Sequence, residues 1–326
     1  MGNQRMVSRS PTTPRIQKPR AQGGRASVQT VSVEGRELRL SNLDKVMYPS
    51  TGFTKGQVID YYARMAPAIL PYLTGRPLTL KRYPDGVDGE AFYEKMCPLH
   101  RPDWVHTATV AGSGKRGYVE FCLIEDLPSL VWVANLASLE LHTLLWSVAH
   151  PDRPGCMVFD LDPGPGADII DCARVAMRFQ TLLADLKLKC FAKSSGGKGL
   201  HVYVPLNTPV TFSRTKAMSR AMAELIERDD PAHVTSNMRK ELRTGKVFVD
   251  WSQNDVHKTT VSVYSLRARE TPTVSMPLDW DEVKAATRRN NAKGLSVDSD
   301  AALARVKSEG DLFAPVLALR QKLPAG

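Results

Sequence analysis

The sequence predicts an α/β fold, and three stretches support this prediction. Met157 to Asp162 is a short apolar run followed at once by Pro-Gly-Pro-Gly, which is typical of a buried strand that ends at a turn. Apolar residues then recur at helical spacing from Ala167 to Leu188, and Cys190 to Ala192 begins a further apolar run. Strand, turn, helix and strand therefore follow one another, as they do in α/β proteins.

The composition is that of an ordinary globular protein. Of the 326 residues, 42% are hydrophobic and 24% are charged. No apolar run approaches the roughly 20 residues that a membrane-spanning helix needs, and the N-terminus lacks the apolar core of a signal peptide. We therefore expect a cytoplasmic protein that does not contact a membrane.

Positive charge is concentrated at the N-terminus. The formal charge is +10, but residues 1–27 carry six basic side chains and no acidic one, which leaves 38 basic against 34 acidic residues in the remainder. This segment is rich in Arg, Pro, Ser and Gln and cannot bury enough apolar surface to fold. We expect a disordered basic tail over residues 1–27 and one folded domain over residues 28–326. The tail either adds non-specific attraction to nucleic acid or has no such role.

The five cysteines are scattered along the chain. No C-x-x-C pair occurs among Cys97, Cys122, Cys156, Cys172 and Cys190. This spacing indicates neither a structural zinc site nor a disulfide framework. We expect reduced and mostly buried thiols.

The first folded segments place two lysines beside a helix start. Residues 28–40 alternate apolar and polar side chains around a Glu-Gly pair, as a hairpin does. Thr54 is a capping residue for a helix that runs from Lys55 to about Leu70. A phosphate at this helix start could meet Lys45, Lys55 and free backbone amides, although solvated surface lysines are the alternative.

The next segment combines basic and aromatic side chains. Residues 78–83 form a predicted strand that carries Lys81 and Arg82 to a Pro-Asp-Gly turn. Phe92 and Tyr93 follow beside further basic residues, a pattern that can stack on bases while the cations hold the backbone. Neighbouring strand residues face opposite sides, so at most one ring faces the core on this interpretation. Internal packing of both rings is the alternative.

Residues 126–146 are apolar at mixed spacing, and a helical stripe extends from Leu130 to Leu141. We therefore expect a helix, with His142 at its end. A histidine in that position packs against the helix or caps it, or its neutral imidazole contacts a phosphate or hydroxyl.

Three carboxylates lie at predicted strand ends. Asp160 and Asp162 share one face of their strand because side chains alternate. Asp250 ends a second apolar strand that begins at about Lys246. Like charges that lie close together are unfavourable unless a cation or proton separates them, so the pair indicates a divalent-metal site, which the third carboxylate would complete. The alternative is that a strand-end aspartate caps the next helix while Asp162 is simply solvated.

A glycine-rich loop and an arginine pair indicate phosphate binding. Ser194 to His201 contains three glycines together with Ser195 and Lys198, which suits a polyphosphate. The loop enters a β-like run and not a helix, so it is not a Walker A loop, and a simple hairpin turn is the alternative. A predicted strand over residues 259–269 places Arg267 and Arg269 on one face, where guanidiniums suit phosphate. A polar connection from Thr273 and a helix over residues 301–319 complete the chain.

Together these features fit metal-assisted phosphoryl transfer from a triphosphate. Asp160 to Gly164, Ser195 to His201 and Val249 to Asn254 resemble the three motifs of archaeo-eukaryotic primase-polymerases. The likeness is greatest to the polymerase domain of bacterial ligase D, an end-joining repair enzyme, and its stand-alone relatives. It covers about Val28 to Leu319 and includes residues 44–49, 81–86 and 264–269.

The resemblance implies the primase-polymerase fold over residues 28–326, in which a mixed sheet with the catalytic carboxylates packs with a second sheet and flanking helices. Asp160, Asp162 and Asp250 would be the catalytic residues and the ligands of two divalent ions, Mn²⁺ or Mg²⁺. The implied nucleotide-binding residues, for an NTP or dNTP, are Lys81, His142, Ser195, Lys198, His201, Gln253, Arg267 and Arg269. The implied residues for DNA and a downstream 5′-phosphate are Lys45, Lys55, Arg82, Phe92, Tyr93, Lys95 and Arg243. Asn42 belongs to the same resemblance. Two positions depart from the family pattern, because Tyr93 stands where relatives often have phenylalanine and Gly197 replaces a common serine.

The implied function is template-directed nucleotidyl transfer that fills short gaps and ends during DNA break repair, at the nucleoid, with ready use of ribonucleotides. No Lys-x-Asp-Gly stretch of a ligase is present, so sealing would need a separate ligase, and an end-binding protein is a further expected partner. A metal-dependent nuclease also uses clustered carboxylates but does not explain the glycine-lysine loop or the arginine pair. A non-catalytic module that binds DNA ends or gaps is the remaining alternative.

Overall fold

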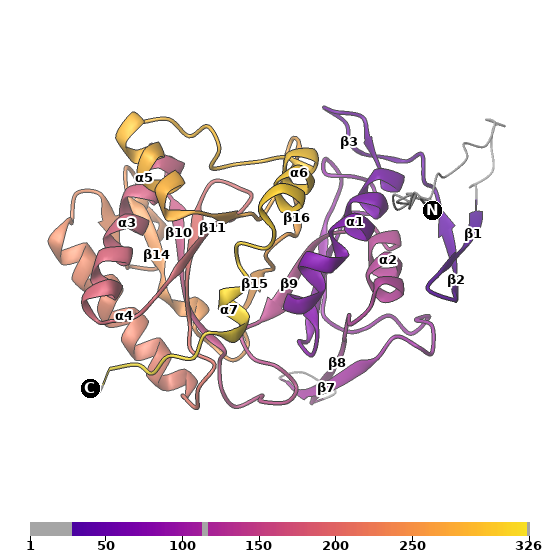
Figure 1. Cartoon of the computed structure of the whole chain (residues 1–326), viewed down its shortest axis with the longest axis horizontal. Coiled ribbons are helices and arrows are strands. Elements are labelled where there is room, and N and C mark those ends of the chain that lie inside the picture. Colours follow the sequence, from indigo (N-terminus) through magenta and orange to yellow (C-terminus); the bar gives the residue numbers. More distant parts are fainter. Residues whose placement is uncertain (1–27, 113–116, 325–326) are drawn as a thin grey trace, which may run out of the picture.

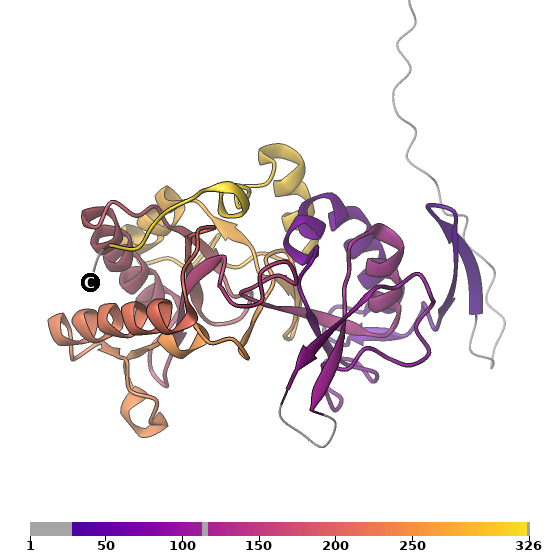
Figure 2. The same ribbon diagram turned by 90° about the horizontal axis from the view of Figure 1, so that it is seen from below.

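The computed structural model describes residues 28–112 and 117–324, which form two packed sheets with helices on their outer sides (Figure 1). The predicted disordered tail over residues 1–27 lies outside the described residues. The β1–β2 hairpin and the α3–α4 region lie at opposite ends of the long axis in both views (Figures 1 and 2). No helix in the described ranges is long and apolar enough to span a membrane.

The first sheet has six strands and carries all three predicted catalytic carboxylates. Only its outermost pair, β13 and β14, is parallel, and the other neighbours are antiparallel, so the sheet is mixed as predicted. In spatial order its strands are β13 (Val234–Thr235), β14 (Val247–Asp250), β10 (Cys156–Pro163), β12 (Leu200–Pro205), β11 (Phe191–Ser194) and β18 (Pro277–Leu278).

The second sheet is antiparallel. It consists of β15 (Thr259–Val261), β9 (Ser138–Leu144), β5 (Leu78–Arg82), β8 (Tyr118–Cys122) and β7 (Thr107–Ala111), with β6 (Phe92–Glu94) paired to β5. Smaller two-stranded units are β1 (Val28–Val33) with β2 (Arg36–Ser41), β3 (Val46–Tyr48) with β4 (Phe53–Thr54), and β16 (Leu266–Ala268) with β17 (Pro272–Val274).

The described residues form two hydrophobic cores, the second of which contains residues of both sheets. Met157, Phe159 and Leu161 of β10 pack with α3 (Ile169–Asp185), α4 (Phe212–Asp229) and α5 (Trp280–Arg289). Cys156 and Val158 alternate with them and pack instead with the second core, which contains α1 (Lys55–Leu73) and α2 (Leu127–Asn135). Strand alternation therefore places Asp160 and Asp162 on the side of β10 that faces the second sheet. The C-terminal helices α6 (Ser299–Glu309) and α7 (Pro315–Ala318) and the short 3₁₀ helices η1 (Lys240–Arg243) and η2 (Trp251–Gln253) complete the described elements.

Several predicted elements are confirmed. The β1–β2 hairpin is formed, and α1 begins at Lys55 after Thr54, whose side chain accepts a hydrogen bond from the Gln57 amide in a capping box. The helix after β10 is capped by Asp168, whose carboxylate accepts the amides of Ile170 and Asp171. This excludes the alternative in which Asp160 or Asp162 caps that helix.

Four predicted elements are wrong in extent or type. Residues 126–146 are not one helix, because α2 ends at Asn135, Ala137 has a φ of 60° and the chain continues as β9. The predicted strand over residues 259–269 is divided into β15 and β16 by a turn at Tyr264, which has a φ of 64°. The predicted C-terminal helix is divided into α6 and α7, and the predicted polar connection before it contains β17, β18 and α5.

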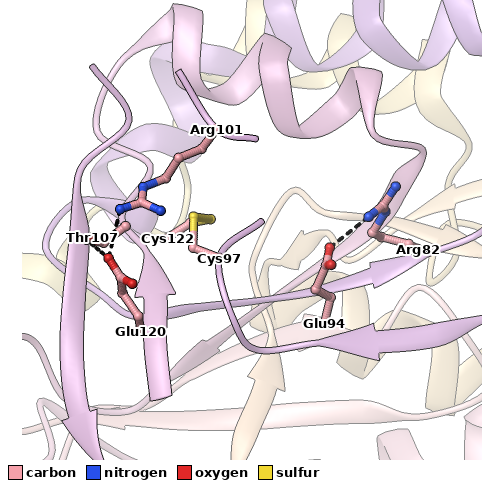
Figure 3. Close-up of a disulfide and its surroundings, with 7 residues drawn as sticks. All are labelled: Arg82, Glu94, Cys97, Arg101, Thr107, Glu120 and Cys122. Atoms are coloured by element: carbon pink, nitrogen blue, oxygen red, sulfur yellow. Dashed lines mark hydrogen bonds and ion pairs between the residues drawn. A yellow bond between two sulfur atoms is a disulfide. The ribbon is translucent and has the colours of Figure 1, made fainter. Parts of the chain in front are cut away.

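The expectation of five reduced thiols is also wrong. Cys97 and Cys122 form a disulfide between the segment after β6 and the end of β8 (Figure 3). The spacing gave no signal because the two residues are 25 positions apart and are brought together only by the sheet. Cys156, Cys172 and Cys190 are free and buried, as expected.

Candidate active site

The three carboxylates lie on neighbouring strands. Asp160 on β10 is directly opposite Asp250 on β14, and Asp162 follows two residues further along the same face of β10. On the other side of β10, Asp160 pairs with His201 of β12, and its Oδ1 lies 3.1 Å from His201 Nε2. The predicted grouping of strand-end carboxylates is therefore present.

Their surroundings give the carboxyls different proton affinities. Burial acts to raise the pKa of Asp160, but the neighbouring His201 and the positive charges of Lys193 and Arg267 outweigh it and hold this pKa below its usual value. Burial, followed by the negative charges of Asp160 and Asp250, raises the pKa of Asp162 to about 7. The Asp162 residue is exposed to solvent, so the two like charges are the main cause of this rise. A cation placed among the three carboxylates would relieve this repulsion.

Asp250 is held within its own turn. Its Oδ1 accepts hydrogen bonds from the Ser252 amide (2.9 Å) and hydroxyl (2.5 Å), and its Oδ2 accepts one from Gln253 Nε2 (3.1 Å). Across residues 28–112 and 117–324, no group of three or more His, Cys, Asp or Glu side chains is arranged so that it could hold a metal ion as it stands. The donor set nevertheless fits a divalent cation, because its carboxylate oxygens are hard ligands and repel one another when no cation is present. His201 Nδ1 and Gln253 Oε1 are buried beside this group without a hydrogen-bond partner, which also favours a bound ligand.

The glycine-rich loop connects β11 to β12 at the same end of the first sheet. The Ser195 hydroxyl oxygen accepts hydrogen bonds from the amides of Gly197 and Gly199, both at 3.2 Å, and Lys198 is exposed on the loop. A Cβ on Gly199 would lie 2.1 Å from the Leu161 carbonyl oxygen, so only glycine fits beside β10. The loop is a hairpin connection, as in the alternative interpretation, but it also lies beside the carboxylate strand.

Arginines from the β16 region contact this loop. Arg267 Nη1 donates a hydrogen bond of 2.5 Å to the Ser195 carbonyl oxygen. A Cβ on Gly197 would lie 2.5 Å from Arg269 Nη2, so the glycine at this departure from the family pattern makes room for the guanidinium. The structure places both arginines beside this loop, although no single strand carries residues 259–269.

Lys81 and His142 also lie close to Arg267. Burial lowers the pKa of His142, so its imidazole is neutral near pH 7. Tyr93 stacks edge-on against His142, with 5.6 Å between ring centroids, and Lys81 Nζ lies 5.2 Å from the Tyr93 ring. Tyr93 and Phe92 are 58% and 43% exposed, so neither ring is a core residue. The prediction that at most one faces the core is confirmed, and internal packing of both is excluded.

A second group of cations surrounds a pocket of about 740 Å³ on the β2 and α1 side of the molecule. Lys45, Lys55, Arg82 and Asn42 line it, and Lys45 Nζ forms an ion pair of 2.8 Å with Asp85. Lys55 is buried, and its ammonium donates to the Ser41 carbonyl at 2.6 Å. Burial, then the charges of Lys45 and Arg82, lower the pKa of Lys55 to about 8. Lys55 is therefore not the solvated lysine of the alternative interpretation.

The remaining predicted residues lie at the margins of these groups. Arg82 pairs with Glu94 at 2.9 Å (Figure 3). Its guanidinium also lies 5.3 Å from the centroid of the Phe92 ring. Lys95 is exposed beyond β6. Arg243 stacks on Phe248 at 3.6 Å, and its charge acts to lower the pKa of Asp162, which places it near the carboxylates.

The sequence did not reveal Glu140, a buried carboxylate on β9 that contacts His142, Arg267 and Tyr83. One signal was available, because Glu140 is the only charged residue in the apolar segment 127–141. The prediction of a helix concealed the contact between Glu140 and His142, because a helix places these two residues on different faces. A strand places them on the same face.

Comparisons with known proteins agree with this geometry. The family model described as LigD, primase-polymerase domain, matches residues 54–313. The multifunctional non-homologous end joining DNA repair protein LigD of Mycobacterium tuberculosis is 43% identical over 86% of this chain. The bifunctional non-homologous end joining protein LigD of Bacillus subtilis is 31% identical over 77% of this chain. The chain spans 37% and 40% of the length of these two relatives.

A solved structure gives the same result for the fold. The polymerase domain of Mycobacterium tuberculosis ligase D, in complex with DNA, matches with a TM-score of 0.79 and 41% sequence identity. The match covers 87% of this chain and 99% of that domain. The sequence, the fold and the carboxylate arrangement therefore agree, and the chain belongs to the LigD primase-polymerase domain family of nucleotidyltransferase enzymes.

Proposed function

We propose that this chain fills short gaps and ends during the repair of broken DNA by adding template-directed nucleotides to a primer 3′-hydroxyl. The observation that carries the proposal is the position of Asp160, Asp162 and Asp250 beside the glycine-rich loop and Arg267. A triphosphate lying on this loop would present its phosphates to the carboxylate group. Mn²⁺ is the proposed cation, with Mg²⁺ as its substitute, and both NTPs and dNTPs are proposed substrates.

The chain's own residues have distinct proposed roles at the nucleotide. Asp160, Asp162 and Asp250 would hold two divalent cations, which supply Lewis acidity toward the primer hydroxyl and the phosphates when bound. Positive charge and hydrogen-bond donors around the triphosphate would bind its oxygens and orient it for in-line attack. The proposed groups are Lys81, His142, Ser195, Lys198, His201, Gln253, Arg267 and Arg269.

A separate group of residues would bind DNA. The pocket of Lys45 and Lys55 has the charge to hold a downstream 5′-phosphate, with Asn42 and Arg82 on its wall. The exposed rings of Phe92 and Tyr93 would stack on the template, and Lys95 and Arg243 would contact its backbone. We propose that the protein acts at the nucleoid in the cytoplasm, together with a separate ligase and an end-binding protein.

The test is primer extension on a gapped duplex with Mn²⁺, with either ribo- or deoxynucleotides. The native chain is expected to add nucleotides directed by the template. Asp160→Ala removes one carboxylate from the group, and we expect it to lower the rate by about a hundredfold or more. Folding of the variant is checked by circular dichroism and by binding of the same duplex.

Other products would point to the other functions. Shortening of the labelled strand would identify a nuclease. Tight binding of the gapped duplex with no product, with every nucleotide and cation tested, would identify a non-catalytic end or gap binding module. Either result would reject the proposed polymerase.

A further inference from the structure

Glu140 is the most completely enclosed acidic side chain near the site. Its side chain is 2% exposed, and it lies on β9 between β5 and β15 in the second sheet. Oε2 lies 3.0 Å from His142 Nε2 and 3.4 Å from Arg267 Nε. Oε1 accepts hydrogen bonds from the Tyr83 hydroxyl (3.2 Å) and the Ala268 amide (3.1 Å) and lies 3.9 Å from Lys81 Nζ.

These partners keep Glu140 ionised. Burial alone would raise its pKa, but the hydrogen bond from His142 and the positive charges of Arg267 and Lys81 lower this pKa to about 2. A buried carboxylate is costly unless its oxygens are paired, and here both oxygens have at least two partners. Glu140 is therefore a fixed negative charge whose partners come from β5, β9, β16 and the turn after β5.

The cationic partners of Glu140 coincide with proposed nucleotide contacts. Lys81 and Arg267 each carry a positive charge that would meet the triphosphate, and Arg267 also reaches the glycine-rich loop through the Ser195 carbonyl. Two cations this close repel each other and would move apart without an anion between them. A carboxylate between them holds both side chains, and the His142 ring, in one arrangement before the ligand arrives.

We infer that Glu140 is a positioning residue of the nucleotide site, which holds Lys81, His142 and Arg267 in place for the triphosphate of an incoming nucleotide. It does not itself meet the substrate, because it lies behind these three side chains and a triphosphate would be repelled by its charge. This inference rests on the proposed function and names how the site is preorganised. It differs from a purely structural role, in which Glu140 would only stabilise β9 and β16.

The test compares Glu140→Gln with Glu140→Asp and with the native chain. Glutamine keeps the shape but removes the charge and places an amide N–H toward groups that are themselves donors. We expect Glu140→Gln to raise the KM for the nucleotide about tenfold or more, with a smaller change in kcat and an unchanged Kd for the gapped duplex. Glu140→Asp restores the charge and is expected to recover part of the loss.

Glu120→Gln is the matched control. Glu120 lies on β8 of the same sheet with its side chain 28% exposed, and it accepts hydrogen bonds from Arg101 and Thr107, both at 2.8 Å (Figure 3). Glu120→Gln removes a negative charge that pairs with an arginine, as Glu140→Gln does, but away from the proposed nucleotide contacts. We expect its nucleotide KM to equal that of the native chain.

The outcomes separate this inference from the proposed function. The rise in the melting temperature of the native chain on addition of nucleotide and Mn²⁺ measures nucleotide binding independently of primer extension. If the native chain binds and extends but Glu140→Gln has the native KM, the positioning role is rejected and the polymerase stands. The role is also rejected if Glu140→Gln and Glu140→Asp lower the melting temperature to the same extent and impair kcat and KM to the same extent. A purely structural role of Glu140 would give this result. If the native chain neither binds nucleotide nor extends a primer, the proposed function and this assignment both fall.

Discussion

Two acidic side chains of the site, Asp162 and Glu140, have opposite electrostatic surroundings. Asp162 lies beside two like charges, whereas Glu140 lies among cations, so the pKa of the first is raised to about 7 and that of the second is lowered to about 2. A cation brought from outside would therefore stabilise ionised Asp162, whereas cations of the chain itself stabilise Glu140. We expect the first to serve a ligand and the second to hold the site together.

The charge of Lys55 makes a prediction about pH. Its pKa of about 8 means that the ammonium loses its proton as the pH rises through this value, whereas a phosphate monoester remains a dianion from pH 7 upward. The preference for a 5′-phosphate over a 5′-hydroxyl on the downstream strand should therefore decrease as the pH rises from 7 to 9. Binding of two gapped duplexes that differ only in this phosphate measures the preference.

Lys55→Arg is the control for this pH dependence, because a guanidinium stays charged throughout the range. Its preference for the 5′-phosphate should be nearly constant between pH 7 and 9, whatever its absolute affinity. A native preference that does not change with pH, or one that Lys55→Met leaves intact, would show that Lys55 does not bind the phosphate.

Residues whose neighbours lie on the same strand could be predicted from the sequence. The common face of Asp160 and Asp162 follows from alternation alone, and the structure has both on one face of β10. The pairing of Asp160 with Asp250 and His201 depends on the register between strands that are distant in sequence. Such a register could not be predicted from local patterns. The residues themselves indicated only that a third strand-end carboxylate would complete the metal site, and the family resemblance added His201 to the nucleotide contacts.

At the scale of elements, two backbone positions account for the main errors. Ala137 and Tyr264 have φ values of 60° and 64°, a conformation that residues with side chains seldom adopt. Each ends an element inside a run whose apolar pattern continues without a glycine. A pattern-based prediction therefore extends the helix through β9 and joins β15 to β16, and so conceals the strand that carries Glu140 and His142.

The disulfide makes a prediction about the stability of the second sheet. It closes a loop of 25 residues that includes β7 and most of β8, and such a cross-link stabilises a fold by about 3 kcal/mol by restricting the unfolded chain. We expect reductant to lower the free energy of unfolding of the native chain by roughly this amount. Urea unfolding with and without reductant measures the difference.

The double variant Cys97→Ser and Cys122→Ser serves as the control, since its stability should not respond to reductant. A thiol count on the unfolded, unreduced native chain should give three free cysteines, from Cys156, Cys172 and Cys190. Five free thiols, together with unfolding that is insensitive to reductant, would contradict the cross-link.

At the scale of the whole molecule, the charge divides into a basic tail and a nearly balanced body. Residues 1–27 carry six of the positive charges, and their removal reduces the formal charge from +10 to +4. We expect deletion of residues 1–27 to weaken binding to undamaged duplex and to reduce the dependence of this binding on salt, because each lost phosphate contact reduces the salt slope by about 0.9. Fluorescence anisotropy over a series of salt concentrations measures both.

The same deletion should leave the preference for a 5′-phosphate unchanged, since Lys45 and Lys55 remain in the folded domain. This comparison distinguishes general attraction from recognition of the gap. An identical salt slope in both chains would show that the tail has no part in binding.

The site also lies across the two hydrophobic cores. Asp160 and His201 belong to strands of the first sheet, whereas Lys81 and Glu140 belong to the second. A nucleotide that contacts residues of both sheets would connect the two sheets. Because a ligand that binds only the folded state stabilises that state, its binding would stabilise both sheets together. We therefore expect bound nucleotide to slow the hydrogen exchange of backbone amides in both α3 and α1, although neither helix contacts the ligand. The bound nucleotide would thus contribute to the stability of the whole fold, and this contribution would be lost when the nucleotide leaves.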